Sequence, residues 1–194
     1  MPSDSPHPSD ADLAQAHLDG DKQAFSLLIE RYGPSLVGYA RRLTGNADDG
    51  SDMAQETFVR LFEKLPQLDT SQPLKPWLFK VCTNLCRNHA KRKKSLLFSQ
   101  LEKVDDDESS SVAELLEDKE PSPSEALLKA TTAKIVRRAV QKLPEKYQVV
   151  ISLFYWEELS YEEIADILKL PLNTVRTHLK RAKEQLNAFL SPLV

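Results

Sequence analysis

Hydrophobic residues recur along this chain at the spacing of an α-helix. Phe25, Leu28, Ile29 and Tyr32, for example, stand at positions i, i+3, i+4 and i+7 of one stretch. This spacing places all four on one side of a helix. Similar stripes occur on both sides of a central polar segment, and no stretch needs a sheet to explain its pattern. The sequence therefore predicts an all-α fold.

About four helices are expected between residues 10 and 94, which would form a first small domain. Residues that interrupt helices set their boundaries. Pro34 should bend or restart the second helix because proline has no amide hydrogen. Gly45 should end that helix, and the third should begin after Gly50. The fourth should run from Trp77 to Lys94.

Two segments lack such stripes. Residues 1–9 hold three prolines among small polar residues and predict a disordered tail. Residues 95–125 are polar, and between Glu102 and Glu125 ten acidic residues stand against two basic ones. Since the whole chain has a net charge of −3, the remainder carries +5. The pattern predicts an acidic, extended linker that leads to a second helical domain, residues 126–194.

The second domain ends in two helices joined by a tight turn. The first begins with a capping box, because Ser160 can accept from the amide of Glu163 while the Glu163 carboxylate reaches back to Ser160. Pro171 interrupts the pattern, and the second helix begins near Asn173. Its apolar stripe consists of Val175, Leu179, Ala182, Leu186 and Leu190. This arrangement predicts a helix-turn-helix.

Polar and basic residues cover the rest of this last helix. If the helix lies in the major groove of DNA, they can reach base edges and phosphates. The predicted contact residues are Asn173, Thr174, Arg176, Thr177, Lys180, Arg181 and Lys183. An ordinary helical hairpin with a solvated basic face is the alternative. The polar residues of the first helical turns favour DNA binding.

The stretches EEIADIL and NTVRTHLKRAKEQL, with the turn at Pro171 between them, resemble the C-terminal helix-turn-helix of bacterial sigma factors of the extracytoplasmic-function (ECF) group. Response-regulator output domains share this arrangement, so the rest of the chain has to distinguish the two. The resemblance implies that residues 126–194 form sigma domain four, which binds the minus-thirty-five promoter element. Residues 10–94 would form sigma domain two.

The stretch SDMAQETFVRLFEKL, residues 51–65, resembles the most recognisable part of sigma domain two. In that family an acidic-x-x-Gln-Glu pattern lies on the helix that grips the clamp helices of the largest polymerase subunit. Asp52, Gln55 and Glu56 match it. Positions i, i+3 and i+4 share one helical face, so these residues should form one polar surface while Phe62 points into the core. A plain solvated face is the alternative.

The stretch LKPWLFKVCTNLCRNHAKRKK, residues 74–94, resembles the family's helix that reads the minus-ten element and melts the promoter. Aromatic rings, amides and cations together suit single-stranded DNA. Phe79 would supply a second aromatic ring, and Trp77 has core packing as its alternative role. The expected minus-ten residues are Trp77, Asn84, Arg87, Asn88, Lys91 and Arg92.

Cys82, Cys86 and His89 fall on adjacent turns of the same helix. Zinc ligation or a thiol sensor is conceivable, but no fourth ligand is evident and cysteines are commonly just buried. No Gly-rich phosphate loop or hydrolase motif occurs, so no cofactor, metal or catalytic site is expected. No apolar run predicts a signal peptide or membrane span, and we expect a cytoplasmic protein.

With the resemblance, these features predict a transcription initiation factor rather than an enzyme. It would bind core RNA polymerase at the clamp helices and the flap, place its two domains on promoter DNA and help to open the duplex. The resemblance also implies an anti-sigma factor as a partner. The competing hypothesis is a stand-alone helix-turn-helix regulator. Such proteins usually dimerise, no dimerisation helix is obvious, and the match at residues 51–65 would be unexplained.

Overall fold

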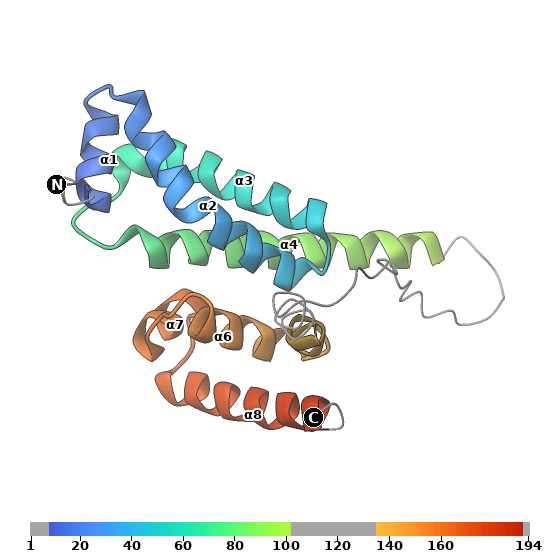
Figure 1. The fold of residues 1–194 in the computed structure, drawn as a ribbon. Coiled ribbons are helices and arrows are strands. Elements are labelled where there is room, and N and C mark those ends of the chain that lie inside the picture. Colours follow the sequence, from blue (N-terminus) through green and yellow to red (C-terminus); the bar gives the residue numbers. More distant parts are fainter. Residues whose placement is uncertain (1–7, 102–134, 192–194) are drawn as a thin grey trace, which may run out of the picture.

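The computed structural model describes residues 8–101 and 135–191. Within these two ranges every regular element is a helix, which confirms the all-α prediction (Figure 1). The first helical unit contains α1 (Asp10–Leu18), α2 (Lys22–Thr44), α3 (Ala47–Lys64), the 3-10 turn η1 (Leu65–Gln67) and α4 (Leu74–Leu101). The second helical unit contains a helical stretch at 135–141, α6 (Glu145–Tyr155), α7 (Tyr161–Leu168) and α8 (Leu172–Leu190).

Helices α2 and α3 are joined by a corner of only two residues. Gly45 ends α2 in the left-handed region, with φ of 71°, and its amide donates to the Arg41 carbonyl at 3.1 Å. Glycine adopts this conformation without steric strain. Asn46 then caps α3 by accepting from the amides of Asp48 and Asp49 at 2.8 and 2.9 Å. The two helices therefore pack side by side, and α4 lies along them (Figure 1).

A buried tyrosine ties α2 to α4. The Tyr39 ring meets the edge of Phe79 at a centroid distance of 5.1 Å. Because the Thr83 hydroxyl donates to the Phe79 carbonyl, the Tyr39 hydroxyl is the donor to Thr83 Oγ1, at 2.6 Å. Burial raises the pKa of Tyr39 well above its ordinary value, which keeps this hydroxyl protonated. A buried polar group thus has its partner, as a stable core requires.

Helix α2 passes through Pro34 without a break, so the predicted restart is wrong. Proline removes one internal hydrogen bond, the one to the Glu30 carbonyl. Gly33, directly before it, has no Cβ to clash with the proline ring. Leu28 and Leu36 are fully buried on either side of the interruption. Core packing of both halves therefore compensates for the missing bond.

Other helix ends also differ from the prediction. Ser9, rather than Asp10, caps α1, because it forms a capping box with Asp12. Helix α4 extends beyond both predicted ends, so residues 95–101 of the expected linker are helical. The rest of that linker, residues 102–125, and the first seven residues of the expected tail lie outside the described residues.

Gly50 lies inside α3, one turn after the helix begins, where the sequence predicts that the helix has not yet started. A Cβ built on Gly50 would lie 2.6 Å from Arg41 Cγ and 2.7 Å from the Arg41 backbone nitrogen. These separations are far below van der Waals contact. The glycine therefore sets how closely α2 and α3 approach.

Gly50→Ala should destabilise the protein although alanine is the better helix former. The gain in helix propensity is about 1 kcal/mol, whereas forcing extra atoms against a backbone costs about 1–3 kcal/mol. Urea unfolding should therefore show a lower midpoint. Gly38→Ala is the control inside α2, because its added Cβ would meet only the Arg42 side chain at 3.4 Å. An equal or higher midpoint for Gly50→Ala would contradict this account.

The second unit folds around its helix-turn-helix. The predicted capping box is present: the Glu163 amide donates to Ser160 Oγ at 3.2 Å, and the Ser160 amide donates to the Glu163 carboxylate at 2.8 Å. Lys169 ends α7 in the left-handed region with φ of 53°. The next amide, that of Leu170, donates to the Ala165 carbonyl at 3.0 Å. This closes the turn before α8.

The two units pack against each other. In Figure 1 the second unit lies beneath α4, with α6 and α7 nearest to the first unit and α8 on the far side. Helix α6 contacts α2, and α7 contacts α4. One cluster of buried hydrophobic residues contains members from both units. The described helices of the two units are thus packed together around a shared hydrophobic cluster.

Candidate nucleic-acid and polymerase interfaces

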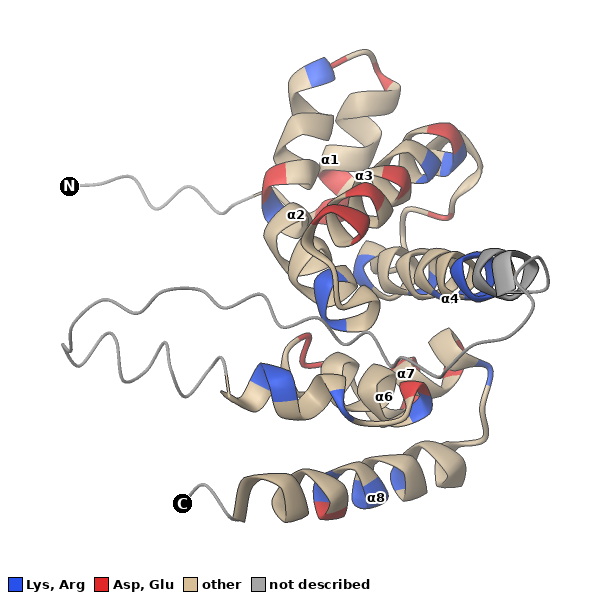
Figure 2. Cartoon of the chain, turned by 90° about the vertical axis from the view of Figure 1, so that its right-hand side faces the viewer, with Lys and Arg blue, Asp and Glu red and all other residues tan. Residues whose placement is uncertain are grey.

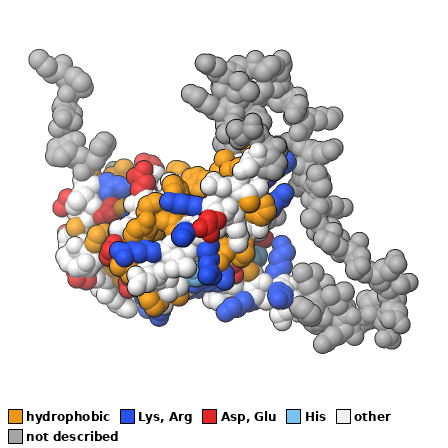
Figure 3. All heavy atoms as spheres, turned by 90° about the horizontal axis from the view of Figure 1, so that it is seen from below, with side chains coloured by type: hydrophobic (Ala, Val, Ile, Leu, Met, Phe, Trp, Pro, Cys, Tyr) orange, Lys and Arg blue, Asp and Glu red, His pale blue; other side chains and the backbone are white. Residues whose placement is uncertain are grey.

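Helix α8 presents the residues that the sequence predicts for DNA. Six of the seven are exposed and Thr174 is partly buried. Val175, Leu179 and Ala182 are buried beneath them and hold the helix on the second unit. Figure 3 views the molecule from below, the side on which α8 lies, and shows Lys and Arg side chains on that face among hydrophobic ones. The predicted residues therefore form one accessible basic surface.

Two cations of this surface lie against aromatic rings. The Arg176 guanidinium is 5.9 Å from the centre of the Tyr161 ring, and Lys183 Nζ is 5.5 Å from that of Tyr155. Phe154 stacks on Tyr161 and meets Tyr155 edge-on, both at 5.1 Å. A hydrogen bond with Tyr155 raises the pKa of Lys183. This aromatic row, Tyr155–Phe154–Tyr161, orients both cations.

The aromatic row was not predicted from the sequence. Its members come from α6 and from the start of α7, and only the fold brings them beside α8. The usable sequence feature was four aromatic residues between positions 154 and 161, shortly before a basic helix.

Helix α3 carries the predicted polymerase-binding residues. Asp52 and Gln55 are exposed and Glu56 is partly buried, and Glu56 pairs with Arg60 at 3.1 Å. The prediction that Phe62 points into the core is wrong, since it is 55% exposed. Its ring meets Phe25 of α2 edge-on at 5.4 Å. The polar surface therefore continues into an exposed apolar one.

Helix α4 brings most of the predicted minus-ten residues to its surface. Trp77 and Arg87 are partly buried, and the four exposed ones are Asn84, Asn88, Lys91 and Arg92. The expected role of Phe79 is wrong, because this ring is fully buried against Tyr39. Lys80, which is not among the predicted minus-ten residues, lies one turn before Asn84. On this surface Arg87 pairs with Glu145 of the second unit at 3.0 Å.

Cys82, Cys86 and His89 contact other protein groups within the packed helices. Cys82 and Cys86 are buried free thiols. The hydrogen bond with Cys82 and burial raise the pKa of Cys86 far above its ordinary value, so this thiol stays protonated and unreactive. His89 Nε2 lies 3.1 Å from Asp49 on α3. Among the residues that the structure describes, no group of three or more His, Cys, Asp or Glu could hold a metal ion.

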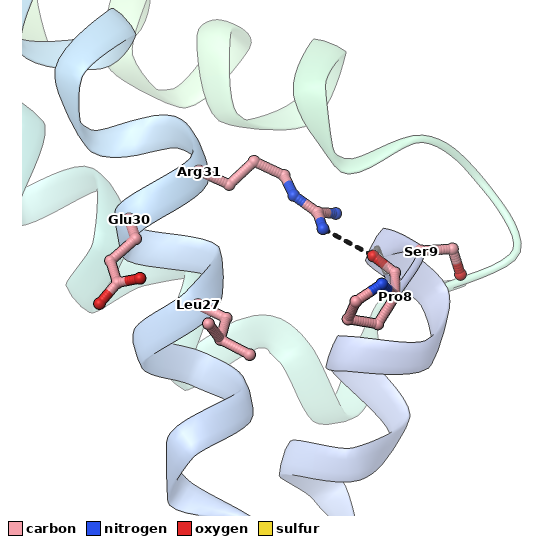
Figure 4. Close-up of a pocket in the computed structure, with 5 residues that line it drawn as sticks. All are labelled: Pro8, Ser9, Leu27, Glu30 and Arg31. Carbon is pink, nitrogen blue, oxygen red and sulfur yellow. Dashed lines mark hydrogen bonds between the residues drawn. The ribbon is translucent and has the colours of Figure 1, made fainter. Parts of the chain in front are cut away.

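A shallow pocket lies elsewhere, between the start of α1 and α2 (Figure 4). Arg31 donates to the Pro8 carbonyl there at 2.6 Å and also pairs with Asp10. Ser9, Leu27 and Glu30 complete the lining, and none of the predicted site residues belongs to it. In the described parts of the chain, no helix has both the length and the apolar character needed to cross a bilayer.

Comparison with known families gives two matches, in the order expected from the sequence. The family described as "Sigma-70 region 2" matches residues 28–96, and "Sigma-70, region 4" matches residues 133–186. The RNA polymerase sigma-H factor of Pseudomonas aeruginosa is 30% identical over 190 residues, 95% of each chain. The ECF RNA polymerase sigma factor SigW of Bacillus subtilis is 29% identical, covering 90% of this chain and 92% of its own.

Solved structures share the fold. CnrH, in complex with the cytosolic domain of CnrY, has a TM-score of 0.67 at 24% identity and covers 95% of this chain and 99% of its own. The sigma factor RpoE of Bartonella quintana, in complex with the anti-sigma factor NepR, has a TM-score of 0.64 at 20% identity. That comparison covers 86% of this chain and 96% of the neighbour. At these identities the similarity describes the arrangement of the helices.

Proposed function

This chain belongs to the ECF RNA polymerase sigma factors, and we propose that it joins core RNA polymerase and directs it to a set of promoters. The observation that carries the proposal is the presence of both sigma regions, in order, on one chain that aligns with whole sigma factors. The family consists of transcription initiation factors. RNA synthesis would take place in the polymerase, and this chain would supply promoter recognition.

The minus-thirty-five element is assigned to α8. Its exposed amide, hydroxyl and cationic groups suit base edges and phosphates in the major groove. The Thr177 hydroxyl donates to the Asn173 carbonyl at 2.8 Å, so its free lone pairs point outward as acceptors. Arg176 and Lys183, both oriented by the aromatic row, would reach the duplex with less loss of side-chain freedom.

The minus-ten element is assigned to α4, where Asn84, Asn88, Lys91 and Arg92 are exposed. Amides can read base edges and cations follow the strand. Because Trp77 is only partly buried, part of this residue remains available to a base. The family leads us to propose an anti-sigma factor as a further partner. Since both polymerase and promoter are cytoplasmic, we assign the protein to that compartment.

A stand-alone regulator is the second candidate, and the polymerase surface distinguishes it from a sigma factor. Pull-down with core polymerase followed by run-off transcription on genomic fragments tests the choice directly. A sigma factor should yield discrete transcripts only when core polymerase is present. Absence of both polymerase binding and transcripts would leave the regulator as the better hypothesis.

Asp52→Ala combined with Gln55→Ala should lower the affinity for core polymerase by about tenfold or more, the effect expected when residues at the centre of an interface are lost. Both side chains are exposed on one face of α3, so the fold should be unaffected. Fluorescence titration with core polymerase measures the change.

The matched control removes an acid and an amide from α2, as Glu30→Ala with Gln23→Ala, both also exposed. This control should bind core polymerase normally, and both double variants should keep wild-type affinity for minus-thirty-five duplex. Wild-type core affinity in the Asp52 and Gln55 variant would refute the assignment of this surface.

A further inference from the structure

We propose that Tyr155 and Lys183 together form a binding site for one phosphate of promoter DNA, in which the tyrosine hydroxyl contacts the phosphate directly. This inference deepens the proposed function and rests on it for the identity of the ligand. It adds a residue of α6 to the surface that is assigned to α8. The ligand class is a phosphodiester of duplex DNA, independent of the base that it carries.

Lys183 lies on a flank of α8 and not at the centre of its exposed face. It stands seven residues after Arg176, so the two cations share one side of the helix, and the aromatic row follows that side. A helix that enters the major groove turns its outer face to the bases and its flanks to the backbones on either side. Figure 2 shows Lys and Arg positions along α8, with α6 and α7 between this helix and the first unit. Lys183 is therefore placed for a phosphate.

Tyr155 reaches the same flank from another helix. It is the last residue of α6, and it is 52% exposed although the residues before it pack into the core. Lys183 Nζ lies 5.5 Å from the centre of its ring. The phenol and the ammonium are thus presented to solvent side by side.

The hydrogen bond between the two groups leaves both of them able to donate to a ligand. An ammonium can only donate, so the Tyr155 hydroxyl oxygen accepts from Lys183 Nζ. This bond raises the pKa of Lys183 and keeps the ammonium charged. The hydroxyl hydrogen and the other ammonium hydrogens are then available to a further acceptor. One cation beside one neutral donor suits the unesterified oxygens of a phosphodiester, which accept from lysine and tyrosine side chains alike.

Phe154 holds the tyrosine in place. Its ring meets Tyr155 edge-on and stacks on Tyr161, with a centroid distance of 5.1 Å in both pairs. Phe154 itself packs against the hydrophobic core. A tyrosine side chain has only two rotatable bonds to order. The site is therefore formed before DNA arrives, which lowers the entropy lost on binding.

The surroundings of Lys183 leave its charge available. Lys180, on the exposed face of α8, has Glu184 Oε1 at 3.9 Å from its Nζ, and this carboxylate competes with a phosphate. The hydroxyl beside Lys183 orients the ammonium without neutralising it. A carboxylate of the polymerase is the other anion that these donors could bind. The position on the flank of the DNA-binding helix favours the phosphate.

The test measures binding of the full chain to two fluorescent duplexes. One carries the upstream element of a promoter found by run-off transcription, and the other carries the same bases in scrambled order. Tyr155→Phe removes the hydroxyl and keeps the ring, Lys183→Ala removes the cation, and the double variant completes a mutant cycle. Tyr32→Phe is the matched control, because it makes the same chemical change on α2, in the first unit.

Tyr155→Phe should lower the affinity for both duplexes by about three- to tenfold, the effect of losing one exposed hydrogen bond. The slope of log affinity against log salt should stay at the wild-type value, because no charge is lost, whereas Lys183→Ala should reduce it. The double variant should lose less than the product of the two single losses, since both groups hold one phosphate. Tyr32→Phe should bind both duplexes as the wild type does.

Wild-type affinity of Tyr155→Phe for both duplexes would overturn the proposal, because a ring that only supports Lys183 is preserved in this variant. A loss confined to the promoter duplex would also overturn it, since it would indicate a base contact. So would single losses that multiply in full, or a loss of core polymerase affinity with duplex binding intact. Failure of the wild-type chain to direct transcription would count against the proposed function, whereas the comparison on the scrambled duplex stands independently of it.

Discussion

Glu157→Leu should destabilise the chain by roughly 3–5 kcal/mol, because it removes one member of the buried ion pair that Arg42 of α2 and Glu157, after α6, form at 2.6 Å. Arg42 would then lie 8% exposed with no counter-charge. Its Nε already lacks a hydrogen-bond partner among the described residues, so the surroundings offer little to replace the carboxylate. Urea unfolding followed by circular dichroism measures the loss. If the units separate instead, the loss is limited to the free energy with which they pack together, and the hydrodynamic radius increases.

The double variant Arg42→Leu with Glu157→Leu should recover most of this loss. Replacing both members of a buried pair by apolar residues is often neutral or stabilising, because the desolvation cost disappears with the charges. Burial raises the pKa of Glu157 and lowers that of Arg42, so in both groups removal from water disfavours the charged form. The double-mutant cycle should therefore show strong coupling. Losses that simply add would mean that the two side chains do not depend on each other.

Local features of the sequence were sufficient to predict where most helices lie, although several of their ends differ from the prediction. The capping box at Ser160 and Glu163 forms as expected, because its partners are three residues apart and need no tertiary contact. The α8 stripe is buried at Val175, Leu179 and Ala182 for a similar reason, since helical periodicity alone places those residues on one side.

Two turn residues could not be predicted. Glu158 and Lys169 both adopt positive φ, at 54° and 53°, a conformation for which glycine or asparagine is the usual indicator. Each follows a helix whose packing fixes the path of the chain, so tertiary structure overrides the local preference. Their side chains carried no information about the turn.

The two phenylalanines that were assigned to the wrong environment show a second limit. Periodicity gives the direction of a side chain but not whether another element covers it. Phe62 points from α3 toward Phe25 and is left at the edge of the packed helices. Phe79 points from α4 onto Tyr39 and is covered completely. Only the positions of neighbouring helices distinguish the two cases.

Sequence patterns could not predict the contacts between the two units. Arg42 and Glu157 are 115 residues apart in the chain, and neither belongs to a motif. Glu145 and Asp166, which pair with Arg87 and Lys80 of α4, have no sequence feature that indicates these partners. Their importance depends on which face of α4 the second unit covers, and a helical stripe specifies only that some apolar partner exists.

Arg176→Ala and Lys183→Ala should affect DNA binding in different ways although each removes one positive charge. Arg176 lies in the first exposed turn of α8, directly after the buried Val175. From there a guanidinium can donate two hydrogen bonds to one guanine edge, which is worth about 1–3 kcal/mol of discrimination. Arg176→Ala should therefore relax the preference at one position of the minus-thirty-five element.

Lys183 lies two turns further along, beside the exposed ring of Tyr155, and should meet phosphate. Phosphate contacts carry little sequence information. Lys183→Ala should weaken binding to all sequences alike and reduce the slope of log affinity against log salt by about 0.9, the loss of one phosphate contact. The measurement is a binding series on single-base variants of the duplex at several salt concentrations. A uniform loss for both variants would make Arg176 a phosphate contact as well, and base reading would then fall to Asn173, Thr177 or Lys180.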